Sequence, residues 1–72
     1  MIVQTQYRFA SEKMAYRFLN TASHLNAEQL TVKYGRNNRH VLVKYQYAEG
    51  TFDSTASELD DLARELEGEE VR

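Results

Sequence analysis

The side chains that could perform acid–base chemistry or bind a metal are few, and their spacing does not bring them together. His24 and His40 are the two histidines, and neither has a second histidine four residues away or a carboxylate two residues away, the spacings of common metal-binding pairs. A zinc site needs three or four converging ligands. We therefore expect both histidines at the surface, and we expect neither a metal nor a cofactor.

Nucleophiles and carboxylates show no catalytic arrangement either. No serine lies in the sharp strand-to-helix turn that presents a hydrolase nucleophile, and the chain has no cysteine. The neighbouring carboxylates Asp60-Asp61 and Glu69-Glu70 fall on a helix and a tail that we expect to be solvated. Three isolated glycines make no phosphate-binding loop. The sequence predicts a protein that is not an enzyme.

Cations gather in one stretch of the chain, namely at Lys33, Arg36, Arg39, His40 and Lys44. Long cationic side chains can follow a phosphate backbone, and Arg36 and Arg39 are the best candidates for phosphate contacts. A net charge of −2 is unusual for a dedicated nucleic-acid domain, which is basic as a rule. The same cluster could accept an acidic protein surface, so both alternatives stay open.

A predicted β-hairpin over residues 30–47 carries this cluster. Every second residue on either side of a Gly-Arg-Asn-Asn turn is apolar or aromatic: Leu30, Val32 and Tyr34, then Val41, Val43, Tyr45 and Tyr47. A period of two indicates strands with one buried and one wet face. Asn37 and Asn38 suit the turn because asparagine tolerates the left-handed conformation.

The flanking segments predict one more strand and two helices. Residues 2–9 alternate as a strand does, and Ser11 can cap a helix whose apolar stripe runs to about Leu25-Asn26. A second helix starts near residues 52–55, capped by Thr55 with Glu58 or by Asp53, and stops before Gly68. We expect residues 1–68 to form a single α+β domain and residues 69–72 to be a frayed acidic tail.

The element order β-α-β-β-α predicts an α+β two-layer sandwich. Both helices would pack on one face of a three-stranded antiparallel sheet of order 1-3-2, since that arrangement buries both apolar stripes. The chain path is similar to a ferredoxin-like plait that lacks its last strand. This likeness concerns architecture and carries no function.

The face of the sheet opposite the helices is expected to be open and polar. Ile2 and Leu42 would be its apolar members. The side chains that we expect to bind a partner there are Gln4, Gln6, Arg8, Lys33, His40, Leu42 and Lys44. Antiparallel sheets often keep one face in water, so an inert solvated surface is the alternative.

The missing fourth strand would leave the edge of the strand over residues 2–9 unpaired. That segment has neither proline nor lysine to block the edge. Pairing with a second copy would give a homodimer, and pairing with the strand of another protein would be β-augmentation.

Composition and charge describe a small protein with two unlike halves. The chain has 72 residues, 42% hydrophobic and 28% charged, which is ordinary for a soluble globular domain. Residues 1–47 carry seven cations and two anions, +5, whereas residues 48–72 carry two cations and nine carboxylates, −7. The lack of cysteine fits a cytoplasmic protein, and we expect no signal peptide and no membrane contact.

The function that these patterns favour is binding without catalysis. We expect a small regulatory or protein-binding module that uses the open polar sheet face, the free strand edge, or both. The alternative is binding of RNA or single-stranded DNA through the basic hairpin tip, with Lys33, Arg36, Arg39 and Lys44 on the phosphates.

Overall fold

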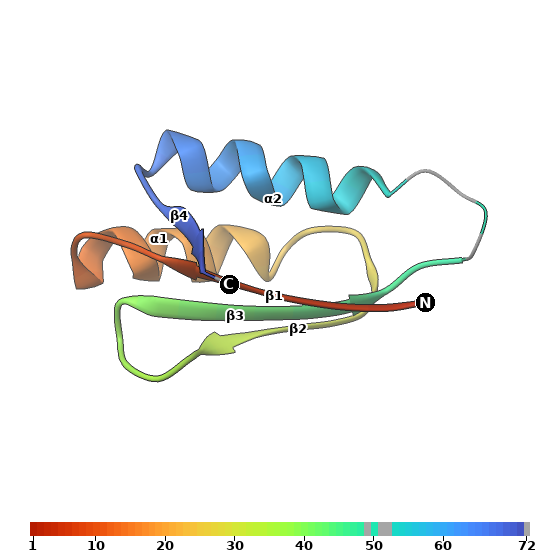
Figure 1. Cartoon of the computed structure of the whole chain (residues 1–72), viewed down its shortest axis with the longest axis horizontal. Coiled ribbons are helices and arrows are strands. Elements are labelled where there is room, and N and C mark those ends of the chain that lie inside the picture. Colours follow the sequence, from red (N-terminus) through yellow and green to blue (C-terminus); the bar gives the residue numbers. More distant parts are fainter. Residues whose placement is uncertain (49, 51–52, 72) are drawn as a thin grey trace.

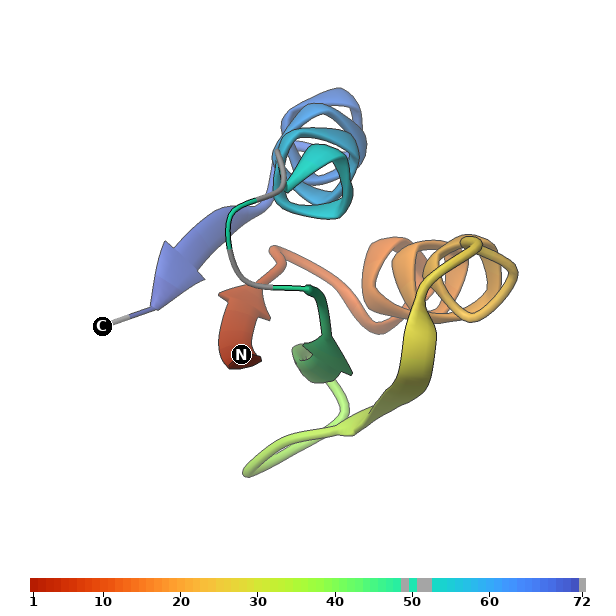
Figure 2. The same ribbon diagram turned by 90° about the vertical axis from the view of Figure 1, so that its right-hand side faces the viewer.

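The computed structural model describes residues 1–48, 50 and 53–71. The elements follow the order β1 (Ile2–Arg8), α1 (Glu12–Ala22), β2 (Glu28–Tyr34), β3 (His40–Gln46), α2 (Ser54–Glu65) and β4 (Glu69–Val71) (Figure 1). Both helices lie over the same face of the sheet, so a helical layer covers a sheet layer (Figure 2). The predicted α+β class is confirmed.

The sheet has four antiparallel strands in the described part of the chain, where we predicted three. Its order is β2-β3-β1-β4, which keeps the predicted order 1-3-2 and adds β4 beside β1. The prediction of a frayed tail was wrong for Glu69–Val71. The backbone groups along the edge of β1 offer hydrogen bonds to the returning chain, and three residues suffice to use them. The chain path is that of a complete ferredoxin-like plait, which still says nothing about function.

The predicted alternation of the strands is confirmed. Val3 pairs with Tyr45 and Tyr7 pairs with Val41, and all four side chains lie on the helix-covered face. Tyr45 is only 1% exposed, whereas its neighbour Lys44 is exposed. The register therefore leaves the cations of the strands on the uncovered face.

A single hydrophobic core lies between the two layers. Phe18 of α1 is fully buried, and its ring centroid lies 5.0 Å from that of Tyr7 and 5.0 Å from that of Phe9. Aromatic pairs at this separation stabilise a core beyond the area that they bury. The buried residues are Tyr7, Phe9, Ala15, Phe18, Ala22, Val41, Val43, Tyr45, Leu59 and Ala63.

Ser11 caps α1 as predicted, but the helix is shorter than its apolar stripe. The Ser11 side chain accepts a hydrogen bond from the backbone N–H of Met14. The helix ends at Ala22 because the Ser23 hydroxyl donates to the carbonyl oxygen of Asn20, 2.8 Å away, and the next residues form a tighter turn. Leu25 still packs against the core from outside the helix.

The hairpin turn depends on an asparagine side chain rather than on a left-handed backbone. Neither Asn37 nor Asn38 has a positive φ. Instead, Asn37 Oδ1 accepts from the backbone N–H of Arg39 at 2.9 Å, and Asn38 Nδ2 donates to Glu12 Oε1 at 2.6 Å. The first bond closes the loop, and the second holds its tip against the start of α1.

The helix α2 ends in a Schellman motif that turns the chain back toward β1. The N–H of Gly68 donates to the carbonyl of Ala63 and that of Glu67 to the carbonyl of Arg64. Glu67, with φ 59°, holds the left-handed position that is usually glycine. Gly68 is needed for another reason: a Cβ at this position would collide with the ring of Phe9.

Candidate interface on the open sheet face

The seven residues that we predicted for partner binding all lie on the face of the sheet away from the helices. Strand pairing sets Gln4 opposite Lys44, Gln6 opposite Leu42, Arg8 opposite His40 and Lys33 opposite Leu42. Side chains directly opposite one another in an antiparallel pair share a face. We call this surface, together with Val71 of β4, the open sheet face.

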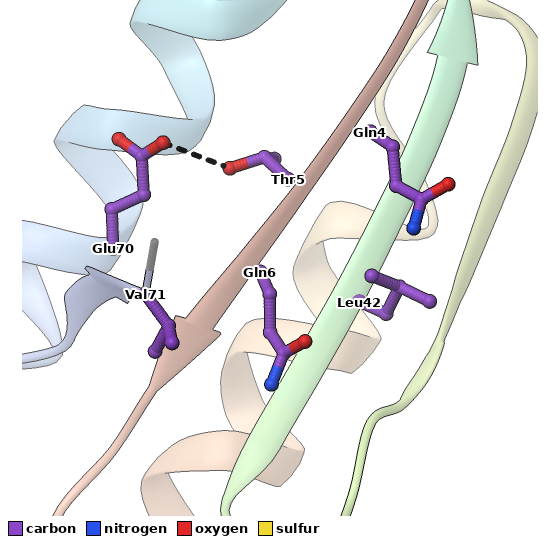
Figure 3. A pocket seen from close by; sticks show the side chains of 6 residues that line it. All are labelled: Gln4, Thr5, Gln6, Leu42, Glu70 and Val71. Carbon is purple, nitrogen blue, oxygen red and sulfur yellow. Dashed lines mark hydrogen bonds between the residues drawn. The ribbon is translucent and has the colours of Figure 1, made fainter.

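A shallow groove of about 350 Å³ crosses the open sheet face where β1 meets β3 and β4. Its lining residues are Gln4, Thr5, Gln6, Leu42, Glu70 and Val71 (Figure 3). Leu42 and Val71 are partly buried and form the apolar part, and Gln6 lies between them because it pairs with both. Glu70 lies opposite Tyr7 and so points toward the helix-covered face of the sheet. Its Oε2 accepts a hydrogen bond from the Thr5 hydroxyl at 3.4 Å.

The apolar centre of the face differs from the one we predicted. We predicted that Leu42 and Ile2 are the apolar residues of this face. Ile2, however, is 65% exposed and lies opposite Gln46 at the far end of β1. Val71 takes its place because β4 sets Val71 opposite Gln6. Val71 is not recognisable from the sequence, because three residues are too few for a period of two to reveal a strand.

Charge is distributed unevenly across the open sheet face. Arg8 forms an ion pair with Glu69, which lies opposite it on β4. In the part of the chain that the structure describes, Lys33 and Lys44 form no ion pair and are exposed. The β4 side of the groove is therefore neutral to acidic, and the β2–β3 side is basic.

The hairpin tip extends this basic side. Arg36 and Arg39 are exposed, and neither has an ion-pair partner among the described residues. His40 is held by its neighbour, since Nδ1 lies 2.8 Å from Asn37 Oδ1. The cations that we proposed as phosphate contacts are accessible, and Asn38 between them donates a hydrogen bond to Glu12 at the start of α1.

We predicted a free edge on β1, but part of that edge is paired. β4 pairs with Gln6, Tyr7 and Arg8 and covers that half of the strand. Only residues 2–5 have no neighbouring strand on that side within the described part of the chain. Self-pairing through the whole of β1 is excluded while β4 stays in place.

The described residues contain no group of three or more histidines, cysteines or carboxylates that could hold a metal ion. His24 is exposed on the turn that follows α1. None of the helices in the described part has the length and apolar character needed to span a bilayer.

Comparison with known proteins adds no assignment. No family model matches this chain. No curated protein and no solved structure matches it either. We therefore infer function from the geometry of the site.

Proposed function

We propose that this chain is a non-catalytic binding module that contacts a protein partner through the open sheet face. The observation that carries the proposal is the groove on that face, in which Leu42 and Val71 lie beside the amides of Gln4 and Gln6, with the exposed Lys33 and Lys44 at adjacent positions of β2 and β3. Interface centres are apolar and poor in charge, and their rims are polar.

The rigidity of the sheet supports this role. β1 and β3 pair along seven residues each, so the groove has a floor that needs no rearrangement before a partner arrives. A preformed surface loses less conformational entropy on binding than a flexible one does. The two helices hold the other face of the sheet, which leaves this face as the one available for contact (Figure 2).

A phage-displayed library of random peptides, selected on the immobilised protein, tests the proposal. We expect the selected peptides to lose at least about tenfold in affinity for a Leu42→Thr variant, since the interface centre dominates binding. Threonine suits a strand, so the fold should be retained, as a thermal melt can verify.

A matched control removes an exposed aromatic ring elsewhere. Tyr16 on α1 is 58% exposed, and a Tyr16→Ser variant should bind the selected peptides as the parent does. If the peptides bind Leu42→Thr as tightly as the parent, or if Tyr16→Ser abolishes their binding, the open sheet face is not the interface.

Binding of single-stranded nucleic acid is the second candidate, because Lys33, Arg36, Arg39 and Lys44 are exposed without ion-pair partners in the described residues. A salt titration with a single-stranded oligonucleotide tests it. Each phosphate contact contributes about 0.7 to the slope of log affinity against log salt. An Arg36→Ala/Arg39→Ala variant should lower that slope by roughly 1.4. An unchanged slope removes this candidate.

A further inference from the structure

The two glutamines of the groove are spaced like the repeat of an extended peptide. Gln4 and Gln6 project from the same face of β1, two residues apart. Residues two apart in a strand are separated by about 6.8 Å, which is also the repeat of any extended chain laid along it. Each amide has both donors and an acceptor. The amides of Gln4 and Gln6 can therefore form hydrogen bonds with the backbone of alternate residues in a peptide that follows the groove.

The unpaired cations stand on one side of this groove. Lys33 flanks Leu42 on β2, and Lys44 lies opposite Gln4 on β3. On the other side Glu69 is already engaged by Arg8. A segment in the groove would meet two ammonium groups without partners toward β2 and β3, and no such group toward β4.

We infer that the partner presents an acidic, extended segment to this groove, an inference that rests on the proposed function. An apolar side chain of the segment packs over the row of Lys33, Leu42, Gln6 and Val71, and the residue two positions along lies over the next row, beside Lys44 and Gln4. Side chains two positions apart on an extended chain lie on one face, so a pattern of acidic, any, apolar, any, acidic residues sets one carboxylate beside Lys44 and the other diagonal to Lys33, within reach of a long side chain.

Nucleic acid fits this groove less well than an acidic peptide does. The strand residues of the open sheet face, among those described, include no aromatic ring on which a base could stack. Tyr7 and Tyr45, the rings nearest its centre, are buried on the opposite face.

The test uses two peptides that differ only in charge. Acetyl-Glu-Thr-Val-Thr-Glu-amide is titrated into ¹⁵N-labelled protein, and acetyl-Gln-Thr-Val-Thr-Gln-amide serves as its neutral counterpart. We expect the acidic peptide to bind at least about tenfold more tightly at low salt, since hydrogen bonds to charged groups are the stronger ones. The amide side chains of Gln4 and Gln6 should show the largest shifts.

Two charge variants locate the effect. In a Lys33→Gln/Lys44→Gln variant, the preference for the acidic peptide should fall to less than about twofold, because its carboxylates have lost their partners. Lys13→Gln/Arg17→Gln removes the same charge from α1, and this variant should keep the preference. Equal binding of both peptides by the parent, or an equal loss in both variants, would overturn the inference.

Failure of the inference is separable from failure of the proposed function. If selected peptides depend on Leu42 but the acidic peptide has no advantage, the face binds proteins of another chemistry. If no selected peptide depends on Leu42 for binding, both the proposed function and the acidic-segment inference are wrong. A mixed-sequence RNA octamer that shifts the same resonances and binds more tightly than the acidic peptide would assign the groove to nucleic acid instead.

Discussion

Two tyrosine hydroxyls join the sheet to α2. Tyr7 Oη donates to Asp60 Oδ1 at 2.6 Å, and Tyr45 Oη donates to Asp53 Oδ2 at 2.7 Å. Asp53 also caps α2, because its Oδ1 accepts from the backbone N–H of Ala56. The two carboxylates thus satisfy hydroxyls whose rings are buried in the core. Asp53 therefore caps α2, and both carboxylates hold the helix against the sheet.

Burial raises the pKa of both tyrosines, and the neighbouring carboxylates, Asp60 for Tyr7 and Asp53 for Tyr45, raise it further. A hydroxyl with a raised pKa in the folded state holds its proton more tightly there than in the unfolded chain. Its contribution to the free energy of unfolding is therefore complete below the ordinary tyrosine pKa of about 10 and is lost as the pH rises above it.

Replacing Tyr7 by Phe should make this dependence visible. At pH 7 the Tyr7→Phe variant should lose about 1–2 kcal/mol, since one hydrogen bond to a charged group disappears. Between pH 10 and 12 the parent should lose stability faster than the variant does. Urea denaturation followed by circular dichroism at each pH measures both. Tyr16→Phe is the control, and a similar loss at pH 7 in that variant would contradict the role of the buried hydroxyl.

At the scale of elements, the turn from α2 into β4 decides how the sheet is completed. Glu67 accepts the left-handed conformation, and Gly68 passes beneath the Phe9 ring. β4 then pairs with the second half of β1, and Glu69 meets Arg8. Residues 67–71 therefore end the helix, contact the core and form the fourth strand.

Two neighbouring substitutions should change stability in opposite directions. Glu67→Gly should stabilise by about 0.5–1 kcal/mol, because glycine adopts a positive φ without the penalty of a Cβ. Gly68→Ala should destabilise by about 1–3 kcal/mol, because the added methyl group forces the Phe9 ring to move. Thermal melts of both variants measure the two effects. If alanine is tolerated at 68 without loss, the ring is not packed as described.

At the scale of the molecule, stability depends on a small core. A chain of this length has a free energy of unfolding of roughly 4–11 kcal/mol. Phe18 is fully buried and contacts two other aromatic rings, so it contributes a large share. Surface charges contribute less than such a residue does.

Truncation of the Phe18 side chain tests how much of the free energy of unfolding depends on it. Phe18→Ala should cost about 3–5 kcal/mol through lost burial and the cavity left behind. The variant should melt far below the parent or be partly unfolded at room temperature, as circular dichroism will show. Phe18→Leu, which fills most of the space, should cost about 1–2 kcal/mol. Equal costs for the two variants would show that the site collapses around the cavity.

Strand alternation was sufficient to predict the sheet and its open face. Val41, Val43 and Tyr45 recur at every second position, and a one-residue slip would have exposed all three. The same alternation set Gln4, Gln6, Leu42 and Lys44 on the uncovered face. These assignments need only neighbours in the sequence, and the structure agrees with them.

What depended on distant neighbours was not predictable from the chain alone. Glu69–Val71 read as a solvated tail, and only the unpaired edge of β1 and the cation of Arg8 make a strand of it. The sequence indicated a possible helix cap at Asp53 and a solvated carboxylate at Asp60, and only the packing of α2 brings tyrosine hydroxyls to them. Short-range periodicity therefore determined which face of each element is buried, whereas tertiary contacts decided the fourth strand, the partners of the buried hydroxyls and the walls of the groove.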